Sequence, residues 1–225
     1  MIIVTGASKG IGKTICERLL SNNQAVIGLA RDTSKLDFES YDCDVSSFKD
    51  IENTVRKIKK NSKSIQGLIN AAGTASMNLA LLTPSDISKK IIETNLLGTI
   101  YCCQLISPLM IREKNGVIIN FSTIAVNLAL KGESIYAASK AGVETFSKVL
   151  ARELSSFNIN VNCIAPGPID TSLIKGVSKT EINNLISRQV IQKQFTKFDI
   201  ADIVELLLNK KFKSISGEVL HIGGS

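Results

Sequence analysis

A tyrosine and a lysine four residues apart form the pair in this sequence best suited to proton transfer. Tyr136 and Lys140 belong to the run Tyr-Ala-Ala-Ser-Lys, and a helix brings positions i and i+4 to one face. A lysine ammonium beside a phenol favours phenolate, so we expect the tyrosine pKa to fall below its ordinary value near ~10. Such a phenol exchanges a proton with an alcohol or alkoxide near neutral pH. The same spacing also occurs on ordinary surface helices, so the interpretation needs support elsewhere.

A glycine-rich segment near the start of the sequence supplies that support. Residues 1–5 form a short apolar run typical of a buried strand, and Gly6, Gly10 and Gly12 follow it before a helical pattern begins. Strand, glycine turn and helix are the context of a dinucleotide-binding site. The diphosphate is expected over the free N–H groups of the helix N-terminus. A glycine-rich loop without a ligand is the alternative.

Further motifs follow in order along the chain. They are Asn70-Ala-Ala-Gly73, Asn95 within Glu-Thr-Asn-Leu-Leu-Gly98, Asn120-Phe-Ser-Thr123, the Tyr136 and Lys140 pair, Pro166-Gly-Pro-Ile-Asp-Thr171 and Gly217-Glu-Val-Leu-His-Ile-Gly-Gly224. With the glycine turn, they resemble the short-chain dehydrogenase/reductase family, and within it 3-oxoacyl-[acyl-carrier-protein] reductases. The resemblance runs nearly end to end. It implies one NAD(P)-binding domain over residues 1–225, with a mobile substrate lid at about residues 172–197.

The resemblance also implies catalytic roles. Tyr136 is the general acid–base, Lys140 binds the nicotinamide ribose, and Asn95 holds a water that continues the proton relay. Family spacing puts the hydroxyl that polarises the substrate carbonyl 13 residues before the tyrosine, at Thr123, where relatives have serine. Ser122 is the alternative, if a small bulge turns its hydroxyl inward.

The cofactor contacts implied by the resemblance form several clusters. They comprise Gly6, Ser8, Lys9, Gly10, Ile11 and Gly12; Arg31; Asp44 and Val45; Asn70, Ala71, Ala72 and Gly73; Tyr136 and Lys140; and Pro166, Gly167, Ile169 and Thr171. Ala71 stands where the family usually has asparagine. Asn70 is expected to brace the sheet more than to touch the ligand. Asp44 is either the adenine contact or a simple turn residue.

The second strand ends in a sequence that bears on cofactor choice. Ala30 occupies the position where NAD-binding proteins usually carry an acidic side chain, and Arg31 follows it. Arg31 offers several donors to a 2′-phosphate, and Lys9 adds a second positive charge. We therefore predict NADP(H) as the cofactor. Asp32 supports the alternative, NAD(H), if a one-residue shift places its carboxylate near the ribose.

Apolar and helical segments alternate along the chain, which predicts a single-domain α/β Rossmann fold. The expected architecture is a doubly wound, seven-stranded parallel sheet with helices on both faces. Strands are predicted at residues 1–5, 25–30, 40–43, 65–70, 116–121, 159–164 and 218–222, and helices at 47–60, 83–113 and 133–156. Residues 31–39 are too few for the full helix that many relatives have there.

Composition narrows the function classes. The 225 residues are 44% hydrophobic and carry a net charge of +7, with lysines dispersed and no basic stripe interleaved with aromatics, so no nucleic acid is expected. We find no run near the ~20 apolar residues of a membrane span. Five cysteines without C-x-x-C spacing indicate a reduced, cytoplasmic protein, and a single histidine argues against a metal site.

The leading functional hypothesis is an NADPH-dependent reductase of a ketone. The alternatives are a dehydrogenase of a sugar, polyol or other small alcohol, and a catalytically silent NADP-binding regulator. The resemblance further implies a homotetramer or homodimer. An acyl carrier protein is considered as a partner, with Arg112 and Lys114 as candidate contacts.

Overall fold

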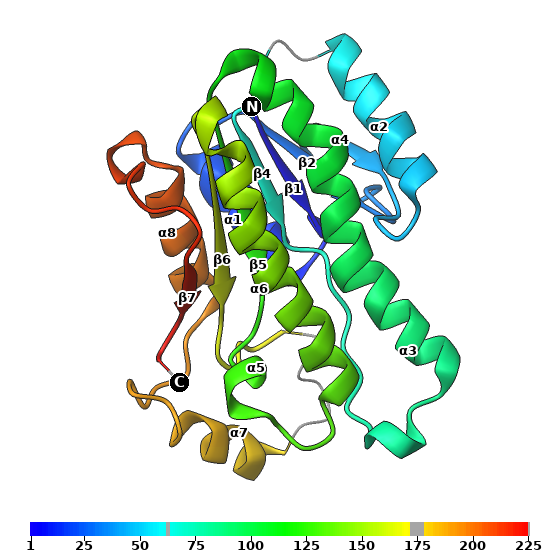
Figure 1. Cartoon of the computed structure of the whole chain (residues 1–225), viewed down its shortest axis with the longest axis vertical. Helices are drawn as coiled ribbons and strands as arrows, with labels where there is room; N and C mark the ends of the chain where they lie inside the picture. The colour runs from blue at the N-terminus through cyan, green and yellow to red at the C-terminus, as the bar shows by residue number, and fades with distance from the viewer. Residues whose placement is uncertain (62–63, 172–177, 225) are drawn as a thin grey trace.

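A seven-stranded parallel sheet organises the chain, as predicted. The structure, a computed structural model, describes residues 1–61, 64–171 and 178–224 (Figure 1). The strand order is β3-β2-β1-β4-β5-β6-β7. The strands are β1 (Ile2–Thr5), β2 (Val26–Ala30), β3 (Ser40–Asp42), β4 (Gly67–Asn70), β5 (Gly116–Phe121), β6 (Ile159–Ala165) and β7 (Val219–His221). The order reverses between β1 and β4, which is where ligands bind in doubly wound folds.

Helices cover both faces of this sheet (Figure 1). They are α1 (Gly10–Ser21), α2 (Phe48–Asn61), α3 (Ser85–Ile92), α4 (Gly98–Glu113), α5 (Ala125–Leu128), α6 (Ser134–Leu154), α7 (Lys179–Ile186) and α8 (Lys197–Leu208). α2, α4 and α6 enclose one apolar cluster and α1 and α8 another. The single-domain α/β prediction therefore describes this fold.

The helix that carries the tyrosine and the lysine buries polar as well as apolar side chains. α6 buries residues at helical spacing, and four of its buried residues are polar: Ser139, Lys140, Glu144 and Ser147. The same face also buries the apolar residues Val143, Ala151 and Leu154. Helical periodicity thus turns a polar stripe toward β5 and β6, where each group must find a partner because burial without one is costly.

The region predicted as one helix over 83–113 has a π-helical turn in its middle. Glu93–Leu97 separates α3 from α4, and Asn95 lies within it. By length and composition the run Ser85–Glu113 would suffice to cross a membrane. Here its apolar residues Cys102, Cys103, Ile106 and Met110 are buried in the cluster shared with the sheet.

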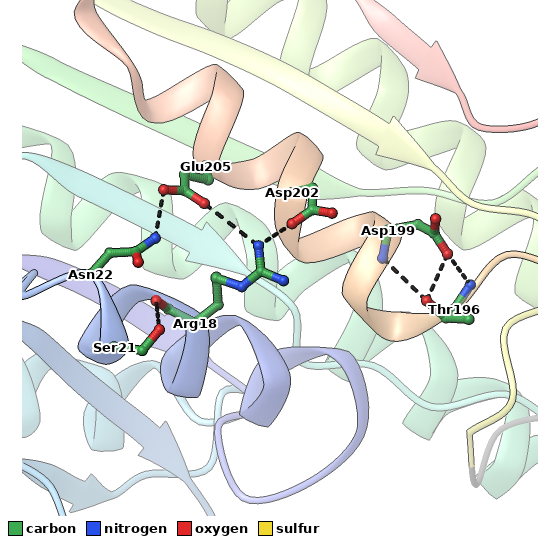
Figure 2. Close-up of polar contacts among 7 residues, drawn as sticks. All are labelled: Arg18, Ser21, Asn22, Thr196, Asp199, Asp202 and Glu205. Carbon is green, nitrogen blue, oxygen red and sulfur yellow. Dashed lines mark hydrogen bonds and ion pairs between the residues drawn. The ribbon is translucent and has the colours of Figure 1, made fainter.

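α1 and α8 are joined across the second face by charged side chains (Figure 2). Arg18 pairs with Asp202 and, at 3.7 Å, with Glu205. The Asn22 amide donates to Glu205 over 2.6 Å. At the start of α8, the Thr196 hydroxyl accepts from the Asp199 N–H, and the Asp199 carboxylate accepts from the Thr196 N–H. This capping box satisfies two N–H groups that the helix leaves free.

α5 and α8 were not anticipated from the sequence. α7 falls within the predicted lid and begins with its own capping box, formed by Ser178 and Glu181. The first six residues of the predicted lid, 172–177, lie outside the described residues. As expected, residues 31–39 contain no helix.

Candidate active site

Two adjoining cavities open where the parallel strands end. The larger, about 670 Å³, runs past the glycine turn and the ends of β2 and β3. The smaller, about 140 Å³, lies between Tyr136, the end of β5 and α7. Their common wall consists of Ile11, Ala71, Gly73, Thr74, Ala75, Met77 and Thr171. A ligand lying in the larger cavity would therefore reach the mouth of the smaller one.

Two glycines allow the turn after β1 to pack closely. Gly6 has φ +69°, and a Cβ there would lie 2.9 Å from the backbone of Ala71 and Ala72. A Cβ on Gly12 would lie 2.4 Å from the Gly6 carbonyl oxygen. The turn therefore requires glycine at both positions for close approach of α1 to the sheet. Ser8, Lys9, Gly10 and Ile11 line the larger cavity beside them.

The end of β2 presents a positive charge to that cavity. Lys9 and Arg31 both line it, as does Ala30, whereas Asp32 does not. The Asp32 carboxylate instead accepts from the Ser34 N–H at 3.0 Å and the Ser34 hydroxyl at 2.7 Å, and these bonds lower the pKa of Asp32. The cationic side chains of Lys9 and Arg31 therefore line the cavity, whereas the Asp32 carboxylate is engaged in a local turn.

Asp44 is a turn residue that also lines the larger cavity. Its Oδ1 accepts from the N–H and hydroxyl of Ser46, at 2.9 and 2.7 Å, which makes it a turn residue. Asp44 and Val45 also line the larger cavity. The turn therefore holds Asp44 at the wall of this cavity, and its contact with adenine stays a prediction.

Tyr136 and Thr123 lie side by side in the wall of the smaller cavity. Burial and, to a smaller extent, the charge of Glu133 raise the pKa of Tyr136 to about 12, and a hydrogen bond with the Thr123 side chain opposes both effects. Thr123 Oγ1 also accepts from the Ala125 N–H at 3.2 Å. The expected lowering of the phenol pKa is therefore wrong for the protein alone, because desolvation outweighs any stabilisation of the phenolate.

Ser122 is oriented differently from Thr123. Its hydroxyl donates to Glu144 Oε1 over 2.5 Å, and both residues are buried. The Ser122 N–H pairs in the sheet with the Ile164 carbonyl oxygen at 2.7 Å. Although Ser122 belongs to the cavity wall, its hydroxyl serves as the donor to a buried carboxylate.

Lys140 is buried beside these groups. Its Nζ donates to the Phe121 carbonyl oxygen at 2.8 Å. Burial lowers the pKa of Lys140 to about 8. A Cβ built on Gly73 would lie 3.7 Å from this Nζ and 3.4 Å from Asn95 Oδ1. Gly73 therefore leaves room directly over the lysine and the asparagine.

Asn95 ties three elements together from the π-helical turn. Its Oδ1 accepts from the Thr74 N–H at 2.8 Å, and its Nδ2 donates to the Thr74 carbonyl oxygen at 2.9 Å. The same Nδ2 donates to Ser139 Oγ at 3.1 Å, and that hydroxyl donates to the Tyr136 carbonyl oxygen at 2.7 Å. The amide thus positions the cavity wall and the tyrosine helix, while its water relay stays a prediction.

Asn70 is a brace within the sheet and lines neither described cavity. Its Nδ2 donates to Asn120 Oδ1 at 2.8 Å, and Asn120 Nδ2 donates to Ser147 Oγ at 2.8 Å. The Asn70 Nδ2 also donates to Cys103 Sγ at 3.4 Å, so Asn70 braces the sheet as expected, and its direct contact with the cofactor has no support in the geometry of the two cavities. Ala71, Ala72 and Gly73 do line the larger cavity.

The Pro166–Ile169 segment closes the smaller cavity. Pro166, Gly167 and Ile169 line it, and Thr171 lines both cavities. The buried Gln189 packs behind Gly167, where a Cβ would lie only 2.0 Å from Gln189 Oε1. Gln189 Nε2 donates to the Lys193 carbonyl oxygen at 3.2 Å.

Some residues of the cavity walls do not belong to the predicted motifs. Thr74 follows the Asn70–Gly73 motif directly, and Glu133 lies one helical turn before Tyr136, so proximity to a motif was the available signal. Met77 and Leu130 also line the smaller cavity, but nothing in the sequence distinguishes them from core residues. Ile182 and Leu185 line it as well, and both lie within the predicted lid. Arg112 and Lys114 precede β5, at the end of the sheet opposite to Phe121 and the cavities. Among the described residues, no group of acidic, histidine and cysteine side chains is suited to hold a metal.

Comparison with known proteins agrees with this geometry. The family model described as short chain dehydrogenase matches residues 1–182. Carbonyl reductase family member 4 of Xenopus tropicalis is 32% identical, over 98% of this chain and 95% of that protein. The 3-oxoacyl-[acyl-carrier-protein] reductase FabG of Escherichia coli is 31% identical, over 99% and 95%.

Two solved structures share the fold at 29% identity. The aldohexose dehydrogenase of Thermoplasma acidophilum, in ligand-free form, has a TM-score of 0.89 over 99% of this chain and 92% of its own. ElxO with NADP bound has a TM-score of 0.90 over 98% and 96%. The chain therefore belongs to the short chain dehydrogenase family of NAD(P)-dependent oxidoreductases.

Proposed function

We propose that this protein is an NADPH-dependent reductase that converts a ketone to a secondary alcohol. The observation that carries the proposal is the position of Tyr136 and Thr123 in a cavity that shares a wall with the larger, glycine-lined one. That larger cavity fits a dinucleotide phosphate, because Gly6 and Gly12 permit close approach and Lys9 and Arg31 supply positive charge. The relatives named as carbonyl and 3-oxoacyl reductases, and ElxO with NADP bound, support it.

NADP(H), when bound, supplies or accepts the hydride, and the side chains of this chain direct the proton. The Thr123 hydroxyl hydrogen-bonds the carbonyl oxygen and orients it toward the phenol. Tyr136 then gives its proton to that oxygen as negative charge develops there. Lys140, held by the Phe121 carbonyl oxygen, faces the space over Gly73 and would bind ribose hydroxyls. A high phenol pKa keeps the proton on Tyr136 until the substrate oxygen becomes more basic.

A second candidate is the oxidation of a sugar or another small alcohol. The structural similarity to an aldohexose dehydrogenase favours it. The same residues serve this reaction in reverse, with Tyr136 accepting the alcohol proton. We also propose that the protein forms a homodimer or homotetramer in the cytoplasm and acts on small molecules.

An acyl carrier protein as partner has little support, because Arg112 and Lys114 lie at the opposite end of β5 from the cavities.

NADPH consumption with a panel of simple ketones, acetoacetyl thioesters and sugars tests the proposal. Tyr136→Phe is the key control. We expect this variant to bind NADPH like the parent but to lose turnover by roughly 10²–10⁴-fold, because only the proton donor is removed. Tyr101→Phe, on the distant α4, is the matched variant and should keep parental rates. Equal turnover by Tyr136→Phe and the parent would refute the mechanism.

A further inference from the structure

The smaller cavity contains a carboxylate to which the proposed reaction assigns no role. Glu133 lies one residue before α6 and three before Tyr136. Among the described residues that line this cavity it is the one acidic side chain, and its titratable companions there are Tyr136 and Lys140. The remaining wall is largely apolar, with Met77 and Leu130 among its members.

Folding does not account for this carboxylate. The backbone of Glu133 is fixed, because its N–H donates to the Leu130 carbonyl oxygen at 3.2 Å and its carbonyl oxygen accepts from the Ala137 N–H at 2.7 Å. Its side chain makes no cap hydrogen bond at the start of α6. It forms none of the ion pairs found among the described residues. The acid is therefore held at the cavity wall and left free to meet a ligand.

The charge of Glu133 acts on the Tyr136 phenol. Glu133 raises the pKa of Tyr136 through its charge, and burial raises the pKa of Glu133 itself. A half-buried carboxylate repels an anion more strongly than a solvated one does, since less water screens it. The same oxygens accept hydrogen bonds from a hydroxyl group. A carboxylate beside the phenol therefore discriminates between substrates by the charge and hydrogen-bonding capacity of the substituent next to their carbonyl group.

We propose that Glu133 is a specificity-determining residue that selects neutral carbonyl substrates bearing a hydroxyl near the carbonyl and rejects those bearing a carboxylate there. The inference rests on the proposed function and narrows its substrate class. Lys140 attracts anions in the same cavity, but its Nζ is tied to Phe121 and is buried. A change at position 133 that leaves Lys140 in place therefore isolates the contribution of the carboxylate.

Matched substrates provide the test. Acetoacetate and methyl acetoacetate present the same ketone with and without a negative charge. We expect the parent to prefer the ester, and Glu133→Gln to raise kcat/KM for the acid by about 10-fold while changing the ester less than about threefold. 4-Hydroxybutan-2-one and pentan-2-one differ only by a hydroxyl in place of a methyl. The parent should favour the hydroxyketone, and Glu133→Leu should abolish that preference.

Glu153→Gln is the matched control, because it removes the same charge from an exposed position near the other end of α6. It should leave both substrate ratios as in the parent, and thermal melts should show that all variants are folded. If Glu133→Gln changes acid and ester by one common factor, Glu133 acts only through the phenol and the selectivity proposal is wrong. If the parent reduces the ketones but Glu133→Leu keeps its hydroxyl preference, the proposal fails while the proposed reaction stands. A parent that turns over none of the four overturns both.

Discussion

Burial governs the two residues that first indicated chemistry. The sequence predicts that Lys140 lowers the pKa of Tyr136, yet burial raises the pKa of the phenol to about 12 and lowers that of the lysine to about 8. Both shifts favour the neutral forms, because a poorly hydrated site disfavours either charge. The site is thus prepared to hold a proton on the phenol, which suits the donation that a reduction requires.

Lys140 should therefore make stability depend on pH. Its pKa falls from 10.5 to about 8 on folding. Between these two pH values the unfolded chain binds more protons than the folded one, so the free energy of unfolding rises with pH. Below pH 8 the buried lysine is charged in the folded protein, and its destabilising effect is then at its full size. Lys140→Met removes that cost but leaves the Phe121 carbonyl oxygen without its donor.

We expect the stability of Lys140→Met relative to the parent to be greatest near pH 7. The advantage should shrink by roughly 3 kcal/mol at most as the pH rises from 8 to 10.5, since one pKa unit corresponds to about 1.4 kcal/mol. Urea unfolding of both proteins across this range measures it. The pKa shifts of the other buried cysteines cancel in the comparison, but that of Cys163 does not, because burial raises its pKa and the charge of Lys140 opposes that rise. Cys163→Ala in both proteins removes this contribution. A pH-independent difference would show that Lys140 is not strongly desolvated.

The adjacent hydroxyls Thr123 and Ser122 should have separable effects. Thr123→Val removes the hydroxyl bonded to Tyr136 and should lower kcat by roughly 10²–10³-fold, as loss of one oxyanion donor does. Ser122→Ala should keep most of the activity but lower the unfolding free energy by about 1–3 kcal/mol, because the buried Glu144 loses its donor. Steady-state kinetics and denaturant unfolding measure the two effects. The opposite ranking of kcat values would make Ser122 the substrate partner.

At the scale of elements, the sequence predicts the helices and strands that have a strong hydrophobic periodicity or carry a motif. It does not predict how these elements contact one another. The buried strand runs and the Tyr136 helix followed from apolar pattern. α8 is rich in apolar residues and lies between the motifs at Pro166–Thr171 and Gly217–Gly224, so neither amphipathic spacing nor a motif indicated it. The π-helical turn was hidden because one extra residue in a turn leaves no mark in a continuous helical pattern. Its consequence, the Asn95 clamp on Thr74, needed coordinates.

The same limit applies to the candidate site. The motifs gave the residues of the glycine turn and the catalytic pair. They did not show that Asp32 bonds Ser34 while Arg31 lines the cavity, because a strand end one residue longer or shorter would exchange the two. Side-chain direction at a strand end depends on register, which sequence alone fixes poorly.

The contact between Gly167 and Gln189 links the Pro166–Ile169 loop to the segment after α7. Gly167→Ala would place a methyl group 2.0 Å from Gln189 Oε1, so we expect a loss of about 1–3 kcal/mol, the usual cost of overpacking. Adding Gln189→Ala should recover part of it, since the obstructing side chain is gone. Thermal unfolding of the two single variants and the double variant gives the coupling. Additive losses would show that the clash is relieved by other movements.

At the scale of the molecule, the parallel sheet brings segments distant in sequence to one edge. The glycine turn after β1, the end of β2 and the loop after β6 meet around the two cavities. A dinucleotide lying there would touch several strands at once. Its binding should therefore stabilise the whole domain against unfolding, since only the folded chain assembles the site.

We expect NADPH to raise Tm more than NADH does. At a ligand concentration 100 times Kd, binding adds about 2.7 kcal/mol, which is roughly 5–10 °C for a domain of this size. Arg31→Ala should remove most of the difference between the dinucleotides, because a charge-assisted contact to the 2′-phosphate is worth about 1.5–3 kcal/mol. Lys57→Ala, on α2 outside both cavities, is the control. A larger shift with NADH would mean that the strand end prefers free ribose hydroxyls.

The pairing of α1 with α8 has a consequence for biosynthesis. Arg18 and Asp202 are 184 residues apart in the chain. At about 5–20 residues per second a ribosome needs roughly ten to forty seconds to make the second after the first. During that interval the apolar side of α1, with Ile15, Cys16 and Leu19, has no α8 to cover it. For most of its synthesis the nascent chain therefore has an apolar helix surface that α8 does not yet cover. On a stalled ribosome, chaperones or neighbouring nascent chains could bind that surface.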